Sequence, residues 1–501
     1  MISSIMENPL LIKELRSRMR GARAYWMLFA YLVILSLALV IAYVTWWRAG
    51  SGSGGSFVVG RIFFQTLFYV QLGLVCLIAP GLTAGAITVE KEQRTYDLLA
   101  LTPMKARSMV IGKLISAVSF VLLLTISSLP LVSVCFLLGG VSPGEVFLSY
   151  LALLLAAFVY GGLGLMWSSM ARNTATATVM TYGTGLIIFW GTGMLAAGEA
   201  LRAVNPAGTL AFAMEMEDYF LFSLPAWIPG LIVNALAGVL FVMVSARKID
   251  SYATDTSVGL RIVSLLLYSA LIFFGFGWLF ASRVSGSIDS DGLLLFISMF
   301  IVLTLLLILT PIFTTGEPDR EGSKALRMPI FRGWTRLFRG RLESGMPFLL
   351  LLLAASIGLF LAGYSLIGKR IPAAISLDIP LAAFLIFVVV TAFGGIQLLL
   401  SSALRSRWAA LASGYLIIAI LILLPLIVLP ASIGPQQMGD FKLVWTPLYL
   451  NPHIALMSLF PDVFQEIPDP AGDVVPFFLA TNLIYMLIAA FVLLKLRRVI
   501  S

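Results

Sequence analysis

The hydrophobic residues of this chain gather into twelve runs, and each run is almost free of charged side chains. An apolar run of about twenty residues is long enough to cross the hydrocarbon core of a bilayer as an α-helix. The pattern therefore predicts an all-α, polytopic integral membrane protein with about 12 transmembrane helices. The predicted spans cover residues 26–47, 57–86, 109–138, 146–170, 174–196, 227–246, 262–282, 292–314, 346–368, 380–404, 408–430 and 475–494.

The polar segments between the runs differ in charge. Lysine and arginine residues near span ends are retained in the cytoplasm, and most of the 33 basic residues fall in alternate segments, starting with the N-terminal one. This asymmetry predicts a multi-pass protein with both termini in the cytoplasm, and the membrane is expected to be the plasma membrane (cell inner membrane). Because the basic residues are dispersed over several loops, no nucleic acid is expected as a partner, although the net charge is +9.

Ionisable side chains are scarce inside the runs. Arg61 and Lys113 are the exceptions, and both lie near the end of a run, where a long basic side chain is expected to reach the interface. Carriers driven by proton or sodium gradients usually keep a charged residue within the membrane. The energy for any transport is therefore expected to enter from outside the membrane. Gln65, Gln71, Asn234, Gln397 and Asn482 are expected to form hydrogen bonds between helices, and contact with a substrate is the alternative.

The two halves of the chain are similar to each other. Since six spans return a chain to its starting side, a six-span repeat would be parallel. The sequence thus predicts two domains, residues 1–250 and a more diverged second half, 251–501. A shift of 233 residues aligns Gly161, Gly162, Ser168, Ser169, Arg172, Ala177 and Tyr182 with Gly394, Gly395, Ser401, Ser402, Arg405, Ala410 and Tyr415, and Asn205 and Pro206 correspond to Asn451 and Pro452.

The segment before the first span has the pattern of an amphipathic helix. Asn8 is a suitable N-cap, Pro9 suits the first helical position, and Leu11, Leu15 and Met19 recur at helical spacing among basic residues. This pattern predicts a helix that lies in the membrane interface. The alternative is a solvated basic leader that only fixes the topology.

The segment between the second and third spans is also charged. Glu90, Arg94 and Asp97 would share one helical face, Glu90 and Arg94 have the favourable i,i+4 spacing, and Pro103 would end the helix. Such a helix could be offered to a cytosolic partner. Ordinary loop charge is the alternative.

These two segments resemble the permeases of ABC-2-type exporters. The resemblance implies that residues 8–23 form an interfacial connecting helix and that residues 88–103 form a coupling helix, which seats in a separate nucleotide-binding subunit. Ser168, Ser169 and Arg172 resemble the family's turn between the fourth and fifth spans. The residues that carry the likeness are Asn8, Pro9, Lys13, Glu14, Leu15, Arg16, Glu90, Glu92, Thr95, Asp97, Leu98, Leu99 and Pro103.

The likeness covers residues 1–250 and is weaker beyond them. Residues 198–226 match the re-entrant helices that precede the sixth span in this family. Where the family commonly has glycine, this chain has Arg94, which is expected to be tolerated within the helix. The second half lacks the paired glutamates and the Leu-Leu, and its charged segment 314–346 is either a diverged docking surface or a topology anchor.

The chain is not expected to be an enzyme. Residues 363–370 have the spacing of a phosphate loop, but Arg370 stands where a magnesium ligand is needed. Cys76 and Cys135 lie in spans without metal-ligand spacing, and His453, the single histidine, is expected to pack or cap in an outer loop. No cofactor or metal is therefore expected in this chain, and ATP would be bound by a partner.

The expected function is that of the transmembrane permease subunit of an ATP-driven exporter with an unidentified substrate. Its expected partners are a cytosolic ATPase subunit, membrane lipid, and either a second copy of the chain or another permease. The alternatives are a secondary transporter and a membrane anchor or regulatory subunit that transports nothing.

Overall fold

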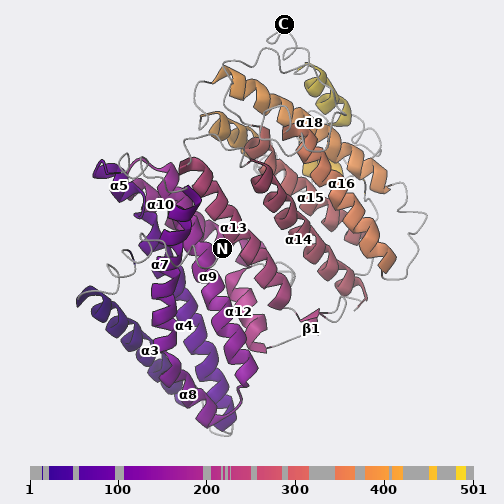
Figure 1. The fold of residues 1–501 in the computed structure, drawn as a ribbon. Helices are drawn as coiled ribbons and strands as arrows, with labels where there is room; N and C mark the ends of the chain where they lie inside the picture. Colours follow the sequence, from indigo (N-terminus) through magenta and orange to yellow (C-terminus); the bar gives the residue numbers. More distant parts are fainter. Residues whose placement is uncertain are drawn as a thin grey trace, which may run out of the picture. The chain divides into compact units, whose positions relative to one another are not determined.

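The computed structural model describes the greater part of the chain as two compact units, Met1–Thr256 and Ser257–Ser501 (Figure 1). The described residues are 14, 22–48, 56–95, 106–195, 205–215, 218–219, 224–225, 227–249, 257–284, 291–314, 345–366, 378–404, 409–420, 451–457, 459 and 481–491.

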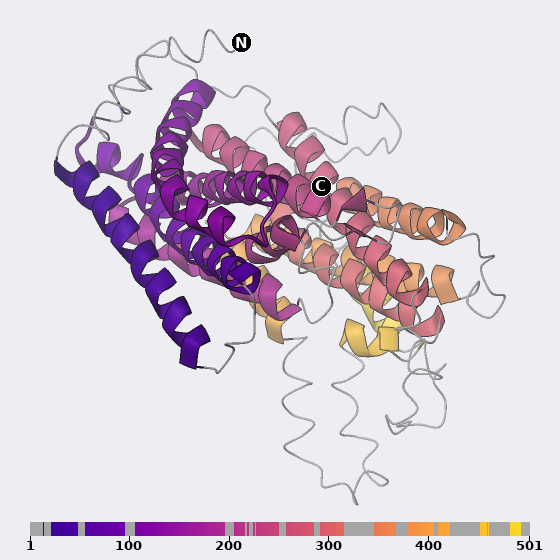
Figure 2. The ribbon, with the colours of Figure 1, turned by 90° about the horizontal axis from the view of Figure 1, so that it is seen from below.

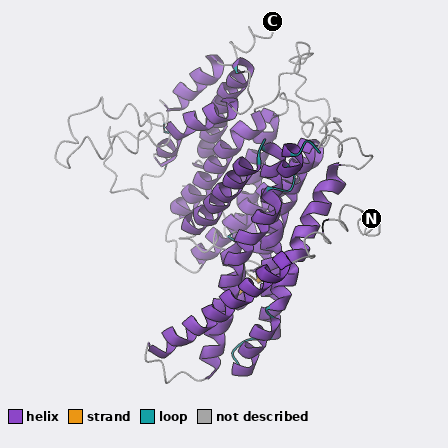
Figure 3. Cartoon of the chain, turned by 90° about the vertical axis from the view of Figure 1, so that its left-hand side faces the viewer, coloured by secondary structure: helices purple, strands orange, loops and turns teal. Residues whose placement is uncertain are grey.

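Helices dominate the first unit (Figure 3). Two short strands, β1 (Asp218–Tyr219) and β2 (Leu224–Pro225), pair antiparallel with Asp218 opposite Pro225. The helices are α3 (Ala22–Arg48), α4 (Ser56–Ala84), α5 (Thr88–Glu92), α7 (Ala106–Ser127), α8 (Leu129–Leu138), α9 (Pro143–Met170), α10 (Thr174–Leu195), α12 (Pro206–Glu215) and α13 (Trp227–Ile249).

The described part of the second unit is helical, and its central pair is α15 against α18 (Figure 2). α14 and α16 pack against each other and against α15, while the short helix α20 contacts both α15 and α18. The bounds are α14 (Ser257–Val284), α15 (Asp291–Thr314), α16 (Gly345–Leu366), α18 (Asp378–Ala403) and α20 (Pro452–Met457), with further apolar helices at Ala409–Ile420 and Thr481–Phe491.

Each predicted span coincides with an apolar helix of the described residues. Nine of these helices are long and apolar enough to cross a membrane, and three are shorter over the residues described, Thr174–Phe189, Ala409–Ile420 and Thr481–Phe491. The prediction of an all-α polytopic membrane protein is confirmed, and the count of twelve spans stays a prediction. The third span is interrupted at Ser128, because Pro130 in the first turn of α8 has no N–H to continue the helical ladder.

α9 lies at the centre of the first unit, where it packs against α4, α7, α10, α12 and α13. Its start is fixed by a capping box, in which the Ser142 and Glu145 side chains each bond the other residue's backbone N–H. Farther along, Gly162 and Gly164 allow close approach. A Cβ at Gly164 would overlap Thr83 Oγ1 of α4, and one at Gly162 would lie 3.4 Å from the Gly238 carbonyl oxygen of α13. Small residues bring membrane helices together in this way.

Three of the five polar side chains named above, Gln71, Asn234 and Gln397, bond between helices as predicted. Gln71 Nε2 donates to Ser128 Oγ at 2.7 Å, and Asn234 Nδ2 donates to Thr209 Oγ1 at 3.3 Å. Gln397 Nε2 donates to the Ala410 carbonyl oxygen at 2.9 Å. Arg61 is likewise held inside the first unit. Its guanidinium group lies 2.9 Å from Glu145 Oε1, and also donates to the Met214 carbonyl oxygen at 2.8 Å.

Candidate functional site

The short helix α5 follows α4 after a tight turn and is held by a serine of α9. The backbone N–H groups of Ile87 and Thr88 both point at Ser168 Oγ, at 2.9 and 3.2 Å. The first N–H groups of a helix have no partner within it. Ser168 is fully buried in the last turn of α9 and supplies that partner from a different helix.

Lys91 of α5 caps the end of α9. Its ammonium group donates to the carbonyl oxygens of Ser169 at 2.7 Å, Ala171 at 3.0 Å and Ser168 at 3.3 Å. The last carbonyl groups of a helix lack internal donors and carry partial negative charge. A cation placed there satisfies both requirements, so Lys91 fixes α5 to the end of α9.

Glu92, the next residue, caps the start of α10. One carboxylate oxygen accepts a hydrogen bond from the Thr174 backbone N–H at 2.7 Å, and the other accepts from Thr174 Oγ1 at 3.1 Å. The N-terminus of a helix carries partial positive charge, so an anion is favourable there. Lys91 and Glu92 therefore match the opposite charges of two successive helix ends. Together they fasten α5 to the turn between α9 and α10.

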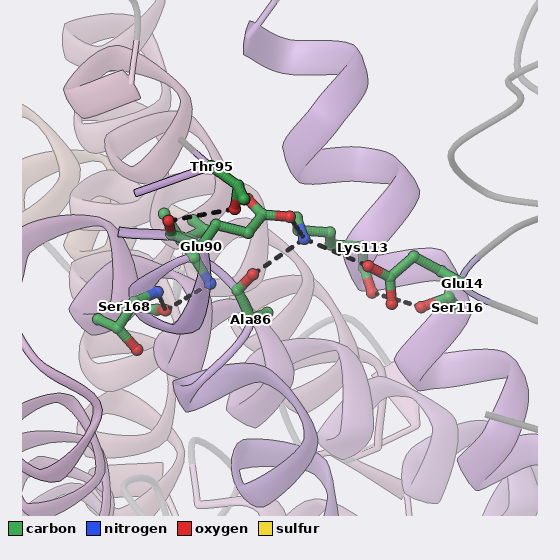
Figure 4. Close-up of polar contacts among 9 residues, drawn as sticks. Glu14, Ala86, Glu90, Thr95, Lys113, Ser116 and Ser168 are labelled. Atoms are coloured by element: carbon green, nitrogen blue, oxygen red, sulfur yellow. Dashed lines mark hydrogen bonds and ion pairs between the residues drawn. The ribbon is translucent and has the colours of Figure 1, made fainter. Parts of the chain in front are cut away.

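A buried ion-pair cluster joins α5 to α7 and to the N-terminal segment. Lys113 Nζ lies 2.7 Å from Glu90 Oε1, 3.2 Å from Glu14 Oε1 and 2.9 Å from the Ala86 carbonyl oxygen (Figure 4). The Lys113 side chain is 2 % exposed. An ammonium group buried so completely needs charged and hydrogen-bonding partners. Lys113 is thus the point at which three separate segments of the chain meet.

The carboxylates of Glu14 and Glu90 enclose the Lys113 ammonium group, and the expectation that Lys113 reaches the interface stays a prediction. The predicted pairing of Glu90 with Arg94 is wrong. Glu90 and Arg94 do not form an i,i+4 pair, because α5 ends at Glu92. Such an exposed pair contributes only about 0.2–0.5 kcal/mol, so a buried lysine is the stronger partner for Glu90.

Arg94 is not a helical residue. Its φ is 57°, in the left-handed region, and its backbone N–H bonds the Lys91 carbonyl oxygen at 3.2 Å. This geometry is typical of the position just after a helix, where glycine is favoured. The expectation that arginine is tolerated here within a helix is therefore wrong. The turn instead exposes the Arg94 side chain.

The structure places the remaining predicted site residues as follows. Ser169 lies in the last turn of α9, and Arg172 is exposed in the turn to α10. Thr95 is also exposed, and its backbone N–H donates to the Glu90 carbonyl oxygen at 3.0 Å. The predictions for Asn8, Pro9, Lys13, Arg16, Asp97, Leu98, Leu99 and Pro103 lie outside the described residues.

Sequence reasoning missed the capping roles of Lys91 and Thr174 and the clustering around Lys113. The available signal was Lys113 itself, the single cation of an apolar run that follows a polar segment containing Glu90 and Glu92.

His453 belongs to α20 and packs within the second unit. Its Nε2 lies 2.9 Å from Thr304 Oγ1, and its ring centroid lies 4.6 Å from that of Phe300. Burial lowers the pKa of His453 to about 4, so the ring is neutral near pH 7. Among the described residues, no group of three or more histidine, cysteine or acidic side chains could hold a metal ion.

Residues 9–226 match the model of the family described as ABC-2 family transporter protein. The chain is a multi-pass membrane protein, and the matched residues confirm over the first unit the resemblance to ABC-2 transporters that the sequence predicted. The match ends within the first unit. Comparisons with curated proteins and with solved structures give no match.

Proposed function

We propose that this chain is the transmembrane permease subunit of an ATP-driven exporter, and that a separate cytosolic subunit hydrolyses the ATP. The ABC-2 transporter domain supports a permease-type transporter. The observation that carries the finer proposal is the attachment of α5, through Lys91, Glu92 and Glu90, to the ends of α9 and α10 and to α7.

This attachment suits a coupling element. A force applied to α5 by a docked subunit would be transmitted by charge-assisted hydrogen bonds, which are short and strong. The same force would reach α9, the central helix of the unit, and α7 at Lys113. In this proposal Asp97, Leu98, Leu99 and Pro103 continue the docking surface, and the side of the membrane that carries α5 is the cytoplasmic side of the plasma membrane.

The surface of α5 that remains open suits a protein partner. Val89 is 40 % exposed, and Gln93 and Arg94 are exposed beside it. The Arg94 side chain forms no ion pair with a described residue, so its charge is free for a partner. An exposed apolar side chain next to an arginine is a common composition for interface residues.

The proposal is tested by purifying the tagged full-length chain in mild detergent from its native membranes. We expect an ATPase with its own phosphate loop to co-purify and to be identified by mass spectrometry. Val89→Asp and Arg94→Glu should each reduce its recovery at least tenfold, because both side chains point away from the contacts that hold α5.

The matched control is Arg48→Glu, an exposed arginine at the far end of α3. Equal expression of all variants shows that insertion is intact. The proposal fails if no ATPase accompanies the wild-type chain. If one does accompany it and Val89→Asp and Arg94→Glu both retain it fully, α5 is not the docking element.

A further inference from the structure

An apolar groove in the first unit is lined by residues of α7 and α13 and by Phe158 of α9. Its volume is about 510 Å³, within the range of roughly 300–1,000 Å³ that is common for small-molecule sites. The walls are almost entirely aliphatic and aromatic, and include Ile111, Ile115, Val118, Phe158 and Val242. The site is independent of the α5 contacts that support the proposed function.

Two small residues account for the depth of the groove. Gly238 of α13 lets the Phe158 ring of α9 lie against the helix backbone, since a Cβ at Gly238 would sit 2.3 Å from a ring carbon. Ser119 occupies the opposite wall on α7. Leu122 and Val239 at the rim are 36 % and 38 % exposed, so the groove opens on the surface of the unit.

The polar end of the groove carries two arginines. Arg107 lies in the first turn of α7 and Arg247 in the last turn of α13, and both line the groove. Both are exposed, and neither forms an ion pair with a residue that the structure describes. Arg247 is favourable at a helix C-terminus, but Arg107 at an N-terminus opposes the helix dipole. The position of Arg107 is therefore not explained by helix stability.

The charge and the shape of the groove together select its ligand. Arg107, Arg247 and the N-terminus of α7 give one end a positive potential, and guanidinium groups bind phosphate oxygens with paired hydrogen bonds. From Arg107 to Leu122 the groove extends about 22 Å along α7, at a rise of 1.5 Å per residue. That distance exceeds half of the hydrocarbon core, which is about 30 Å thick. One acyl chain fits such a groove.

We propose that the groove is a binding site for an anionic phospholipid in the leaflet on the α5 side. The phosphate group lies between Arg107 and Arg247, and one acyl chain lies along α7 over Phe158. A zwitterionic phospholipid such as phosphatidylcholine also supplies a phosphate group, but its own ammonium group offsets that charge, so it neutralises Arg107 and Arg247 less well than an anionic lipid. A free phosphate satisfies the cations but leaves the apolar walls uncovered.

The proposal is tested with the full-length chain, purified in detergent and depleted of lipid. Dioleoyl phosphatidylglycerol, dioleoyl phosphatidylcholine and glycerol phosphate are each titrated, and bound lipid is counted by native mass spectrometry. We expect one phosphatidylglycerol to bind at least tenfold more tightly than phosphatidylcholine, and glycerol phosphate not to bind. Arg107→Ala and Arg247→Ala should each weaken phosphatidylglycerol binding about fivefold, the effect of one basic side chain at an anionic membrane surface.

Two matched controls separate this site from lipid that surrounds any membrane protein. Lys248→Ala removes the neighbouring positive charge outside the groove and should change binding less than twofold. Ser119→Trp fills the groove and should abolish the tight binding of one lipid, whereas Leu123→Trp, on the exposed surface of the same helix, should not.

Equal binding of the two phospholipids would overturn the proposal, as would equal losses in Arg247→Ala and Lys248→Ala. Tight binding of glycerol phosphate alone would replace the lipid by a free anion. A different amphiphile that co-purifies with the wild-type chain and is lost in Ser119→Trp would identify the groove as a site for that amphiphile and not for phospholipid.

Discussion

The two units share a helical framework, and the first carries a charged site, formed by Glu90, Lys91, Glu92 and Lys113. α4 packs against α9 in the first unit, and α15 packs against α18 in the second. α4 contains Pro80 and α15 contains Pro311. Three residues later each helix has a fully buried threonine, Thr83 or Thr314. The central pair of helices is therefore built in the same way in both units.

The proline in each helix is accommodated by the same contact. An internal proline disturbs the carbonyl groups of the preceding turn. Tyr182 Oη donates to the Leu77 carbonyl oxygen at 2.7 Å, and Tyr415 Oη donates to that of Ile308 at 3.0 Å. Leu77 and Ile308 each stand three residues before the proline, and the two tyrosines are aligned by the 233-residue shift.

The short helices α12 and α20 also begin alike. Asn205 Oδ1 accepts a hydrogen bond from the Ala207 backbone N–H at 2.8 Å, and Asn451 Oδ1 accepts from that of His453 at 2.9 Å. Proline follows each asparagine at the first helical position. These shared contacts support the prediction that the second unit is a diverged copy of the first.

The sequences of the two units differ at the charged site. Glu90, Glu92 and Lys113 lie in the first unit, within the part of the chain that matches the transporter family. The sequence of residues 315–344, which lie outside the described structure, has no Glu-x-Glu followed by Leu-Leu. Helix packing can thus be maintained in a second unit whose sequence lacks this motif. In the proposed function, the charged site serves the docking and coupling of a partner subunit.

The largest loss of stability is expected when the buried ammonium group of Lys113 is removed. Lys113→Met removes the ammonium group that Glu14 and Glu90 share, and breaking a buried ion pair by removing one member costs about 3–5 kcal/mol. We expect a loss near the lower figure, because Glu14 and Glu90 are partly exposed. Thermal unfolding in detergent is followed with a thiol-reactive fluorophore, since Cys76 and Cys135 both lie in the first unit and neither is exposed.

The control for Lys113→Met is the double variant Lys113→Met with Glu90→Gln. Removing one of the two uncompensated charges should recover part of the lost stability. An unchanged melting temperature in Lys113→Met alone would show that the cluster contributes nothing to the first unit.

The sequence allowed the spans to be predicted but not the site. A span such as 292–314 was located within one residue of α15, because the length of an apolar run is set by the thickness of the bilayer. The partners of Lys113 could not be predicted, because Glu14 lies 99 residues away in the chain. The end of α5 was also missed, because tertiary contacts of Glu90 outweigh its local pairing with Arg94.

A smaller loss of stability is expected when either tyrosine loses its hydroxyl group. Comparing the two losses tests whether the two units are stabilised by equivalent contacts. Tyr182→Phe and Tyr415→Phe each remove one hydrogen bond to a carbonyl group near a proline, at a cost of about 1 kcal/mol. Equal losses of stability would show that the two contacts are energetically equivalent. A loss at Tyr182 with none at Tyr415 would show that the second contact has no energetic equivalent of the first.

This measurement needs a reporter in each unit. The native cysteines report on the first unit. For the second unit, Ala382→Cys in a background with Cys76→Ala and Cys135→Ala places a single thiol at a fully buried position of α18. The tyrosine variants are compared in the background that reports on their own unit.

The smallest change in stability is expected at Arg94, whose backbone lies in the left-handed region just after α5. A side chain in the left-handed region costs about 1–2 kcal/mol, and Arg94→Gly removes that strain. Glycine also increases the entropy of the unfolded chain, by roughly 0.5–1 kcal/mol. We therefore expect Arg94→Gly to raise the stability of the first unit by about 0.5 kcal/mol. Its neighbour Gln93 has a right-handed backbone with φ of −78°, so Gln93→Gly should lower stability by a similar amount. If both glycine variants are destabilised equally in the thiol assay, the left-handed turn after α5 is wrong.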